Sequence, residues 1–204
     1  MLIPNLFHQF PDYKPIRGVL HVGAHTFEEE PFYYANGMND DQILWIEANT
    51  TLIPKHKKNV VCAVIGDEDN KEVEFMVTNN MQSSSILNLK THKEEHPWVH
   101  EISRSKRTLI TLNTLLHQLE KTHDAFDFIN LDIQGAELMA LKGATKLLPY
   151  IRSIYTEVNI KELYEGCAQM FEIDDFLNTW GFKRVATEMT SHGWGDAFYI
   201  KRIE

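Results

Sequence analysis

Short apolar segments alternate with amphipathic ones in the first part of the chain. Apolar runs at Val19–Val22, Ile43–Asn49 and Val60–Gly66 are bounded by turn residues and have the length of strands. The mixed segment Glu28–Asn36 indicates a short helix that ends at a glycine. Alternation of polar and apolar residues at Glu72–Thr78 predicts one further strand. The pattern therefore predicts strands joined by helices and turns.

The second half of the chain repeats this alternation. Leucines at helical spacing follow Thr111, which is placed to cap their helix. Strands are predicted at Asp127–Asp132 and Ser153–Val158, with a helix between them that Pro149 stops. A further helix is predicted at Asp174–Trp180. Two strands, expected to be antiparallel, close the chain: Lys183–Thr187 and Ala197–Lys201.

This order of elements predicts an α/β fold. We expect a mostly parallel sheet with helices on both faces and an antiparallel C-terminal strand. Residues 1–204 are expected to form one domain, with 1–17 as an N-terminal extension and the polar residues 79–107 as a surface excursion. Because ligands of such sheets bind beyond the carboxyl ends of the strands, those positions hold the candidate site residues.

The composition excludes several classes of protein. Hydrophobic residues make up 43% of the 204-residue chain, as in ordinary globular proteins. The formal net charge of -9 would repel phosphate backbones, which disfavours nucleic acid as a partner. No apolar run reaches the length of roughly 18 residues that a membrane helix needs, and three prolines interrupt the first 17 residues. We expect a soluble, cytoplasmic protein, and the sequence leaves its oligomeric state open.

The predicted first strand ends in a turn with a single glycine. Gly23 and Ala24 would let the backbone approach a ligand closely, and Glu47 could accept hydrogen bonds from both hydroxyls of a ribose. Together they indicate a cofactor that contains adenosine. NAD would need a G-x-G-x-x-G turn for its pyrophosphate, and the acidic run Glu28–Glu30 would repel that group. The cationic cofactor S-adenosyl-L-methionine fits this turn better.

Later strands offer groups for the second substrate. Asp132 ends a strand and could deprotonate a hydroxyl, although it could also do no more than cap the following helix. Glu157 and Asn159 alternate at the end of the next strand, so both could face the same crevice. Trp194 lies between two glycines and could stack on a sugar or an adenine. Two polar residues lie close to it in sequence: His192 and Asp196.

Three histidines have the spacing of ligands on one helix face. His92, His96 and His100 are four residues apart, but Pro97 removes a helical hydrogen bond between them. Neither Cys62 nor Cys167 lies near enough in sequence to complete a zinc motif. We therefore predict no metal site.

The motifs at these strand ends occur together in one known family. The chain resembles the FkbM family of S-adenosylmethionine-dependent methyltransferases over roughly residues 18–201. The resemblance rests on the order of the motifs "LHVGAH", "ILWIEANTTL", "CAVIGDEDNKEVEF", "SSSIL", "ITLNTLL", "DFINLDIQGAELMALKGA" and "HGWGDAFYIK". It implies a Rossmann-like methyltransferase fold and methyl transfer to oxygen, often on a sugar or a glycosylated natural product.

The resemblance also implies roles for individual residues. It places the methionine part of the cofactor at Gly23 and Ala24, the ribose at Glu47, the adenine at Ala63 and Val64, and the reacting methyl at Asp132. The chain departs from the family pattern at His21, His25 and Gln134, where an acidic residue, an asparagine and a glutamate are usual. We expect the two histidines to bind the carboxylate of the cofactor or to line the acceptor site.

The predicted function is an S-adenosylmethionine-dependent O-methyltransferase. Its acceptor is expected to be a sugar hydroxyl of a glycan or of a glycosylated metabolite. The candidates for the general base are Asp132, Glu157 and His192, with His21 as a further choice. The alternative is a module of the same fold that binds the cofactor without turnover.

Overall fold

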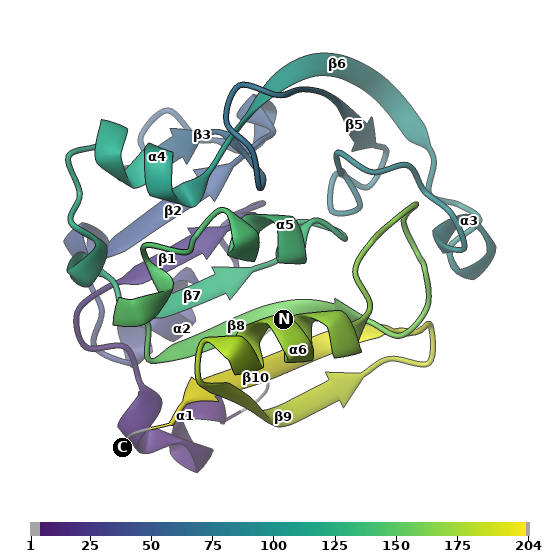
Figure 1. The fold of residues 1–204 in the computed structure, drawn as a ribbon. Coiled ribbons are helices and arrows are strands. Elements are labelled where there is room, and N and C mark those ends of the chain that lie inside the picture. Colours follow the sequence, from purple (N-terminus) through teal and green to yellow (C-terminus); the bar gives the residue numbers. More distant parts are fainter. Residues whose placement is uncertain (1–4, 203–204) are drawn as a thin grey trace.

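A seven-stranded sheet forms the centre of the protein (Figure 1). The computed structural model describes residues 5–202. The strand order is β3-β2-β1-β7-β8-β10-β9. The strands are β1 (Val19–Val22), β2 (Ile43–Glu47), β3 (Val60–Cys62), β7 (Phe128–Leu131), β8 (Ser153–Asn159), β9 (Phe182–Met189) and β10 (Trp194–Lys201). The first five in this spatial order pair in parallel, and β10 runs antiparallel to both of its neighbours, which confirms the predicted arrangement.

Helices cover both faces of this sheet. Successive residues of a strand point to opposite faces, so each buried strand presents apolar side chains to both of them. In β1, Leu20 and Val22 belong to one buried apolar cluster, whereas Val19 belongs to the other. Three helices pack on the first face: α4 (Leu112–Gln118), α5 (Glu137–Lys142) and α6 (Met170–Thr179). Two helices pack on the second face: α1 (Leu6–Gln9) and α2 (Glu30–Ala35). The helices on either face confirm a Rossmann-like α/β fold.

The N-terminal extension packs on the sheet. The ring of Phe7 in α1 contacts Phe128 and Phe198, with ring centroids 5.6 and 6.3 Å apart. Residues 1–4 of the extension lie outside the described residues. Short 3-10 helices occur at Pro11–Tyr13, Asp40–Gln42, Thr50–Leu52, His123–Ala125 and Leu148–Tyr150. Within residues 5–202, no helix has the length and apolar character to cross a membrane.

A second, three-stranded sheet stands at one end of the first (Figure 1). It consists of β4 (Val64–Ile65), β6 (Glu101–Ile110) and β5 (Glu72–Thr78), in that order. The run Val60–Gly66, which the sequence predicted as one strand, is therefore two strands in different sheets. The division falls at Ala63, whose N–H still bonds the carbonyl of Glu47 before the chain leaves β2 to pair with β6.

The segment 79–107, expected as a surface excursion, contains part of this second sheet. β6 pairs antiparallel with β5, and the short helix α3 (His92–Glu95) precedes it. Residues 101–106 are exposed and mostly polar, and Arg104 pairs with Glu101 and Glu74. A strand stabilised by pairing and surface charges buries few of its own side chains. Its sequence therefore lacks the apolar pattern that reveals the other strands.

Candidate active site

A cavity of about 780 Å³ opens at the carboxyl ends of β1, β2, β7 and β8. β1 and β7 are neighbours, and the strand order reverses between them, which is where α/β sheets bind ligands. Ten residues singled out from the sequence line this cavity: His21, Gly23, His25, Glu47, Ala63, Val64, Asp132, Glu157, Trp194 and Asp196. The fold thus brings together residues that are up to 175 positions apart (196 minus 21).

Gly23 forms the turn after β1 where two backbone segments meet. Its φ is +90°, and a Cβ added there would lie 1.8 Å from the carbonyl oxygen of Asp132. Its N–H also bonds the carbonyl of Ile46 at the end of β2, at 2.9 Å. Only glycine can combine this positive φ with so close an approach to β7. The single glycine that the sequence offers is therefore needed for packing the turn.

Glu47 lies buried at the end of β2 and is held by two backbone N–H groups. Its Oε2 accepts a hydrogen bond from His25 N at 2.8 Å, and its Oε1 accepts one from Asn49 N at 2.6 Å. Burial raises the pKa of this carboxyl, while the two hydrogen bonds act in the opposite direction. A carboxylate has about four acceptor positions. These two hydrogen bonds therefore use about half of the acceptor positions of Glu47, which lines the cavity.

His21 belongs to a buried polar network beneath the turn. Asn130 Nδ2 donates to Tyr33 Oη at 2.8 Å, and His21 Nδ1 lies 2.8 Å from the same oxygen. His21 Nε2 lies 3.3 Å from the carbonyl oxygen of Gly23. Burial lowers the pKa of His21 to about 3, so the ring is neutral, with Nε2 assigned as the donor to Gly23. Both nitrogens are thus used within the protein, and His21 supports the turn.

Asp132 and Glu157 are joined through the side chain of Gln134. The Nε2 group of Gln134 donates to Asp132 Oδ1 at 2.6 Å and to Glu157 Oε2 at 2.8 Å. Tyr164 Oη donates to Gln134 Oε1 at 2.6 Å, which fixes the orientation of the amide. A glutamate at position 134 would place a third carboxylate here without the two donors. Sequence reasoning noted Gln134 as a departure from the family but did not assign it to the site.

The two linked carboxyl groups lie in different environments. Asp132 is exposed to the cavity, whereas Glu157 is buried. Burial, reinforced by the nearby Asp132, Glu137 and Asp196, raises the pKa of Glu157 well above its usual range. Burial and the Asp132 charge likewise raise the pKa of Asp196 to about 6. Its burial and the neighbouring carboxyl groups therefore favour the protonated form of Glu157.

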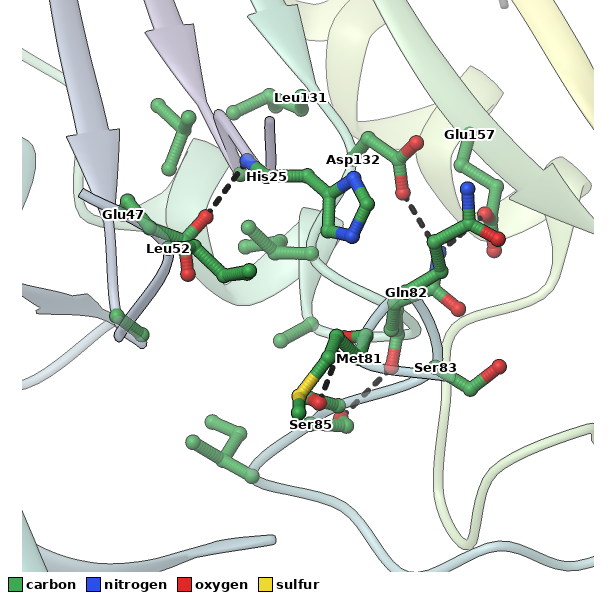
Figure 2. Close-up of a pocket in the computed structure, with 18 of the residues that line it drawn as sticks. His25, Glu47, Leu52, Met81, Gln82, Ser83, Ser85, Leu131, Asp132 and Glu157 are labelled. Carbon is green, nitrogen blue, oxygen red and sulfur yellow. Dashed lines mark hydrogen bonds between the residues drawn. The ribbon is translucent and has the colours of Figure 1, made fainter. Parts of the chain in front are cut away.

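One wall of the cavity comes from the segment 79–107. Figure 2 shows Met81, Gln82 and Ser83 on the side of the cavity opposite Glu47 and Asp132. The hydroxyl of Ser85 donates to the carbonyl oxygen of Gln134 at 2.7 Å, which ties this wall to the loop after β7. Sequence reasoning missed this contribution because the segment is polar and has no strand or helix periodicity before residue 101.

Three residues named from the sequence do not line the cavity. Ala24 is buried in the apolar cluster beneath the turn. Asn159 is buried at the end of β8, where its backbone pairs with Trp194. His192 lies in the turn between β9 and β10, and its Nδ1 is 3.0 Å from Glu95 Oε2. The alternation that suggested a common face for Glu157 and Asn159 is present, but the chain turns away at the strand end.

Comparison with known proteins identifies the family to which the chain is similar. The sequence model of the methyltransferase FkbM domain matches residues 21–184. The 2-O-methyltransferase NoeI of Sinorhizobium fredii is 35% identical over 115 residues, a match that covers 55% of this chain and 42% of that protein. The chain thus matches less than half the length of this relative.

Two solved structures are also similar to the chain. Magnesium protoporphyrin IX methyltransferase (ChlM) from Synechocystis PCC 6803, solved with bound SAM, is 11% identical with a TM-score of 0.48; the match covers 95% of this chain and 74% of that one. A SAM-dependent methyltransferase from Aquifex aeolicus is 12% identical with a TM-score of 0.43, covering 97% and 93%. The family match itself spans most of the 204 residues. The chain therefore belongs to the FkbM family of S-adenosylmethionine-dependent methyltransferases.

Proposed function

We propose that this protein methylates a hydroxyl group of a sugar, in a glycan or in a glycosylated metabolite. The observation that supports it is the Gln134 side chain, which joins an exposed Asp132 to a buried Glu157 in the same cavity as Glu47. The name of the relative NoeI, a 2-O-methyltransferase, agrees with oxygen as the methyl acceptor.

The cofactor side of the cavity fits S-adenosylmethionine. Glu47 keeps free acceptor positions for the ribose hydroxyls, and Gly23 presents backbone without a side chain. Ala63 and Val64 add small apolar surface where an adenine can lie. When bound, the cofactor supplies an electrophilic methyl group on a sulfonium. Carboxylates near this group favour a cation, in keeping with the acidic residues of the cavity.

The acceptor side is built around the Gln134 bridge. We assign Asp132 as the group that takes the proton from the acceptor hydroxyl, because its carboxylate reaches the cavity and Gln134 fixes one of its oxygens. Burial raises the pKa of Glu157 and so favours its protonated form, which can donate a hydrogen bond that orients the acceptor. A base in this position contributes roughly 10²–10⁴-fold to the rate, and alignment contributes further. His192 lies outside the cavity lining, so we give it no role in proton transfer.

The test is methyl transfer by the purified protein. S-adenosylmethionine would be incubated with a panel of methyl glycosides and oligosaccharides, and the products analysed by mass spectrometry and by NMR of the new O-methyl group. We expect O-methylation of at least one sugar. Tight binding of S-adenosylhomocysteine in calorimetry without methylation of any panel member would instead support the binding module. Methylation at nitrogen or carbon would contradict the proposal.

A further inference from the structure

Next to the Gln134 bridge, the cavity wall consists of aromatic and imidazole rings. The rings that line it are His92, His96, Trp98, Tyr164 and Trp194. The ring centroids of His92 and Tyr164 are 5.4 Å apart, those of His92 and His96 are 4.8 Å apart, and those of His96 and Trp98 are 5.4 Å apart. Because Tyr164 also bonds Gln134, this ring wall begins beside the reacting carboxyl groups.

His92 places an unpartnered polar atom in the ring wall. The residue is only 5% exposed, and its Nδ1 has no hydrogen-bond partner among the described residues. Its backbone N–H bonds the carbonyl of Leu163, which fixes α3 against the loop before α6. Nδ1 is enclosed by protein atoms, so a ligand does not reach it. The other ring nitrogen, Nε2, makes no hydrogen bond within residues 5–202 and is not enclosed, so it is the nitrogen open to a ligand hydroxyl in the cavity.

Trp98 supplies an exposed apolar surface at the same wall. Its side chain is 64% exposed although it lines the cavity and packs edge-on against His96. Indole faces contact apolar C–H surfaces while polar groups around them make hydrogen bonds. A sugar ring has both kinds of surface, since its C–H face is apolar and its hydroxyls lie around the edge. The ring wall matches this division.

The charges around the cavity restrict the kind of sugar. Six carboxyl residues line it: Glu28, Glu29, Glu47, Asp132, Glu157 and Asp196. Among the lining residues within the described part of the chain there is no lysine or arginine. A phosphate or a uronic acid would therefore meet carboxyl groups with no lysine or arginine among the described lining residues to pair with it. The acceptor ring is expected to be uncharged.

We infer that His92, Trp98 and the adjoining rings form the acceptor subsite, and that this subsite takes an uncharged sugar ring rather than a sugar phosphate or a uronic acid. His92 Nε2 bonds a ring hydroxyl, and the indole of Trp98 covers the C–H face. Tyr164 and Gln134 connect this subsite to Asp132, so that a neighbouring hydroxyl reaches the base. The inference rests on the proposed function for the identity of the ligand.

The test measures sugar binding directly, without turnover. Methyl glucoside, methyl mannoside and methyl rhamnoside would be titrated by saturation-transfer NMR in the presence of S-adenosylhomocysteine, beside glucose 1-phosphate and methyl glucuronide. We expect Trp98→Ala to weaken binding of the best neutral glycoside at least about tenfold, and His92→Phe, which keeps a ring but removes the nitrogens, by about fivefold. Phe171→Ala is the matched control, because Phe171 is 63% exposed and lies outside the cavity lining.

The outcomes separate this inference from the proposed function. Unchanged affinity in both variants, tighter binding of the phosphate or the glucuronide, or no binding of any neutral glycoside by the wild-type protein overturns the subsite. Glycoside binding that depends on Trp98 and His92 supports the subsite, even when no bound sugar is methylated; that last result counts against the proposed function alone. Calorimetry with S-adenosylhomocysteine on each variant should give wild-type affinity and shows that the variants are folded.

Discussion

At the scale of single residues, the carboxylates at the ends of β2 and β7 are held in different ways. Glu47 is buried and fixed by two backbone N–H groups, so its position depends on the main chain of β2 and of the turn after β1. Asp132 is exposed to the cavity and fixed by one side-chain amide. Backbone donors give a rigid binding group, whereas a side-chain donor leaves the second oxygen of Asp132 available to a substrate. The first arrangement suits binding, and the second suits proton transfer.

Replacing Glu47 should affect the cofactor first. For Glu47→Ala we expect the affinity for S-adenosylhomocysteine to fall more than about tenfold, because a charged hydrogen bond to ribose contributes roughly 1.5–3 kcal/mol. Isothermal titration calorimetry measures this affinity. Glu68→Ala serves as the control, since Glu68 is an exposed carboxylate outside the cavity lining. An unchanged dissociation constant in Glu47→Ala would remove Glu47 from the cofactor site.

Replacing Asp132 should affect turnover. Asp132→Asn keeps the size of the side chain but removes the charge that accepts the proton. We expect kcat to fall by about 10²-fold or more, with only a small change in cofactor affinity. Steady-state kinetics with a saturating sugar acceptor, beside thermal melting, gives both quantities. A kcat within about threefold of wild type would exclude Asp132 as the base.

Gly23 offers a test of the backbone contact between β1 and β7. Gly23→Ala should lower the free energy of unfolding by roughly 3 kcal/mol or more, because the new Cβ collides with the Asp132 carbonyl and φ is positive. Gly181→Ala is the matched control: its φ of +82° imposes the same strain, but nothing lies within 4 Å of the added Cβ. Urea denaturation measures both. Equal losses in the two variants would show that the collision is relieved cheaply.

At the scale of elements, the sequence predicted the buried strands and the helix that Thr111 caps, and missed the exposed strand β6. β1, β2 and β7 are buried at every residue, and all but one of the residues in each are apolar. β6 is exposed along most of its length, and its pairing with β5 is a long-range contact that local composition does not encode. For the same reason the sequence predicted the strand-end residues of the cavity but not the wall from 79–107. That wall depends on contacts such as Ser85 with Gln134.

The predicted cap of α4 allows a test of a local signal. Thr111 Oγ1 accepts a hydrogen bond from Thr114 N at 3.2 Å, as expected for an N-cap residue. Thr111→Ala should lower the free energy of unfolding by about 1 kcal/mol, and Thr111→Ser should restore most of it. Urea denaturation of the two variants and the wild type measures the difference. If serine were no better than alanine, the hydroxyl would contribute nothing to the helix.

At the scale of the whole molecule, different parts of the fold supply the two sides of the cavity. The seven-stranded sheet positions Glu47, Asp132 and Glu157 at its carboxyl edge. The chain between β5 and β6, which includes α3, supplies the opposite wall and the rings of His92, His96 and Trp98. Placing several carboxyl groups between these layers has a cost, because burial disfavours their ionised forms. This cost should appear in the dependence of stability on pH.

Glu137 is the group through which this dependence can be measured. Its Oε1 accepts hydrogen bonds from Ile133 N and Gly135 N at 3.0 and 3.1 Å, while burial, helped by Asp132, raises its pKa to about 7. Between pH 4.5 and 7 the unfolded chain loses this proton and the folded chain keeps it, so the stability contributed by Glu137 falls as pH rises and stays low above pH 7. The lowered pKa of His21 acts oppositely, since its contribution falls as pH drops below 6.5.

The variant Glu137→Gln removes the carboxyl group and leaves His21 unchanged, so it separates their two effects on the pH dependence of stability. The amide oxygen of glutamine can accept the same two backbone hydrogen bonds without a charge. We expect the melting temperature of the variant, relative to wild type, to rise from pH 5 to about pH 7 and to level off above it, because only the wild-type protein has the Glu137 carboxyl, whose proton the unfolded chain loses at lower pH than the folded chain. Differential scanning calorimetry at several pH values measures the difference, and Glu68→Gln, at an exposed position, should show none. If the melting temperatures of Glu137→Gln and wild type changed with pH in parallel, Glu137 would already be ionised in the folded protein at pH 5.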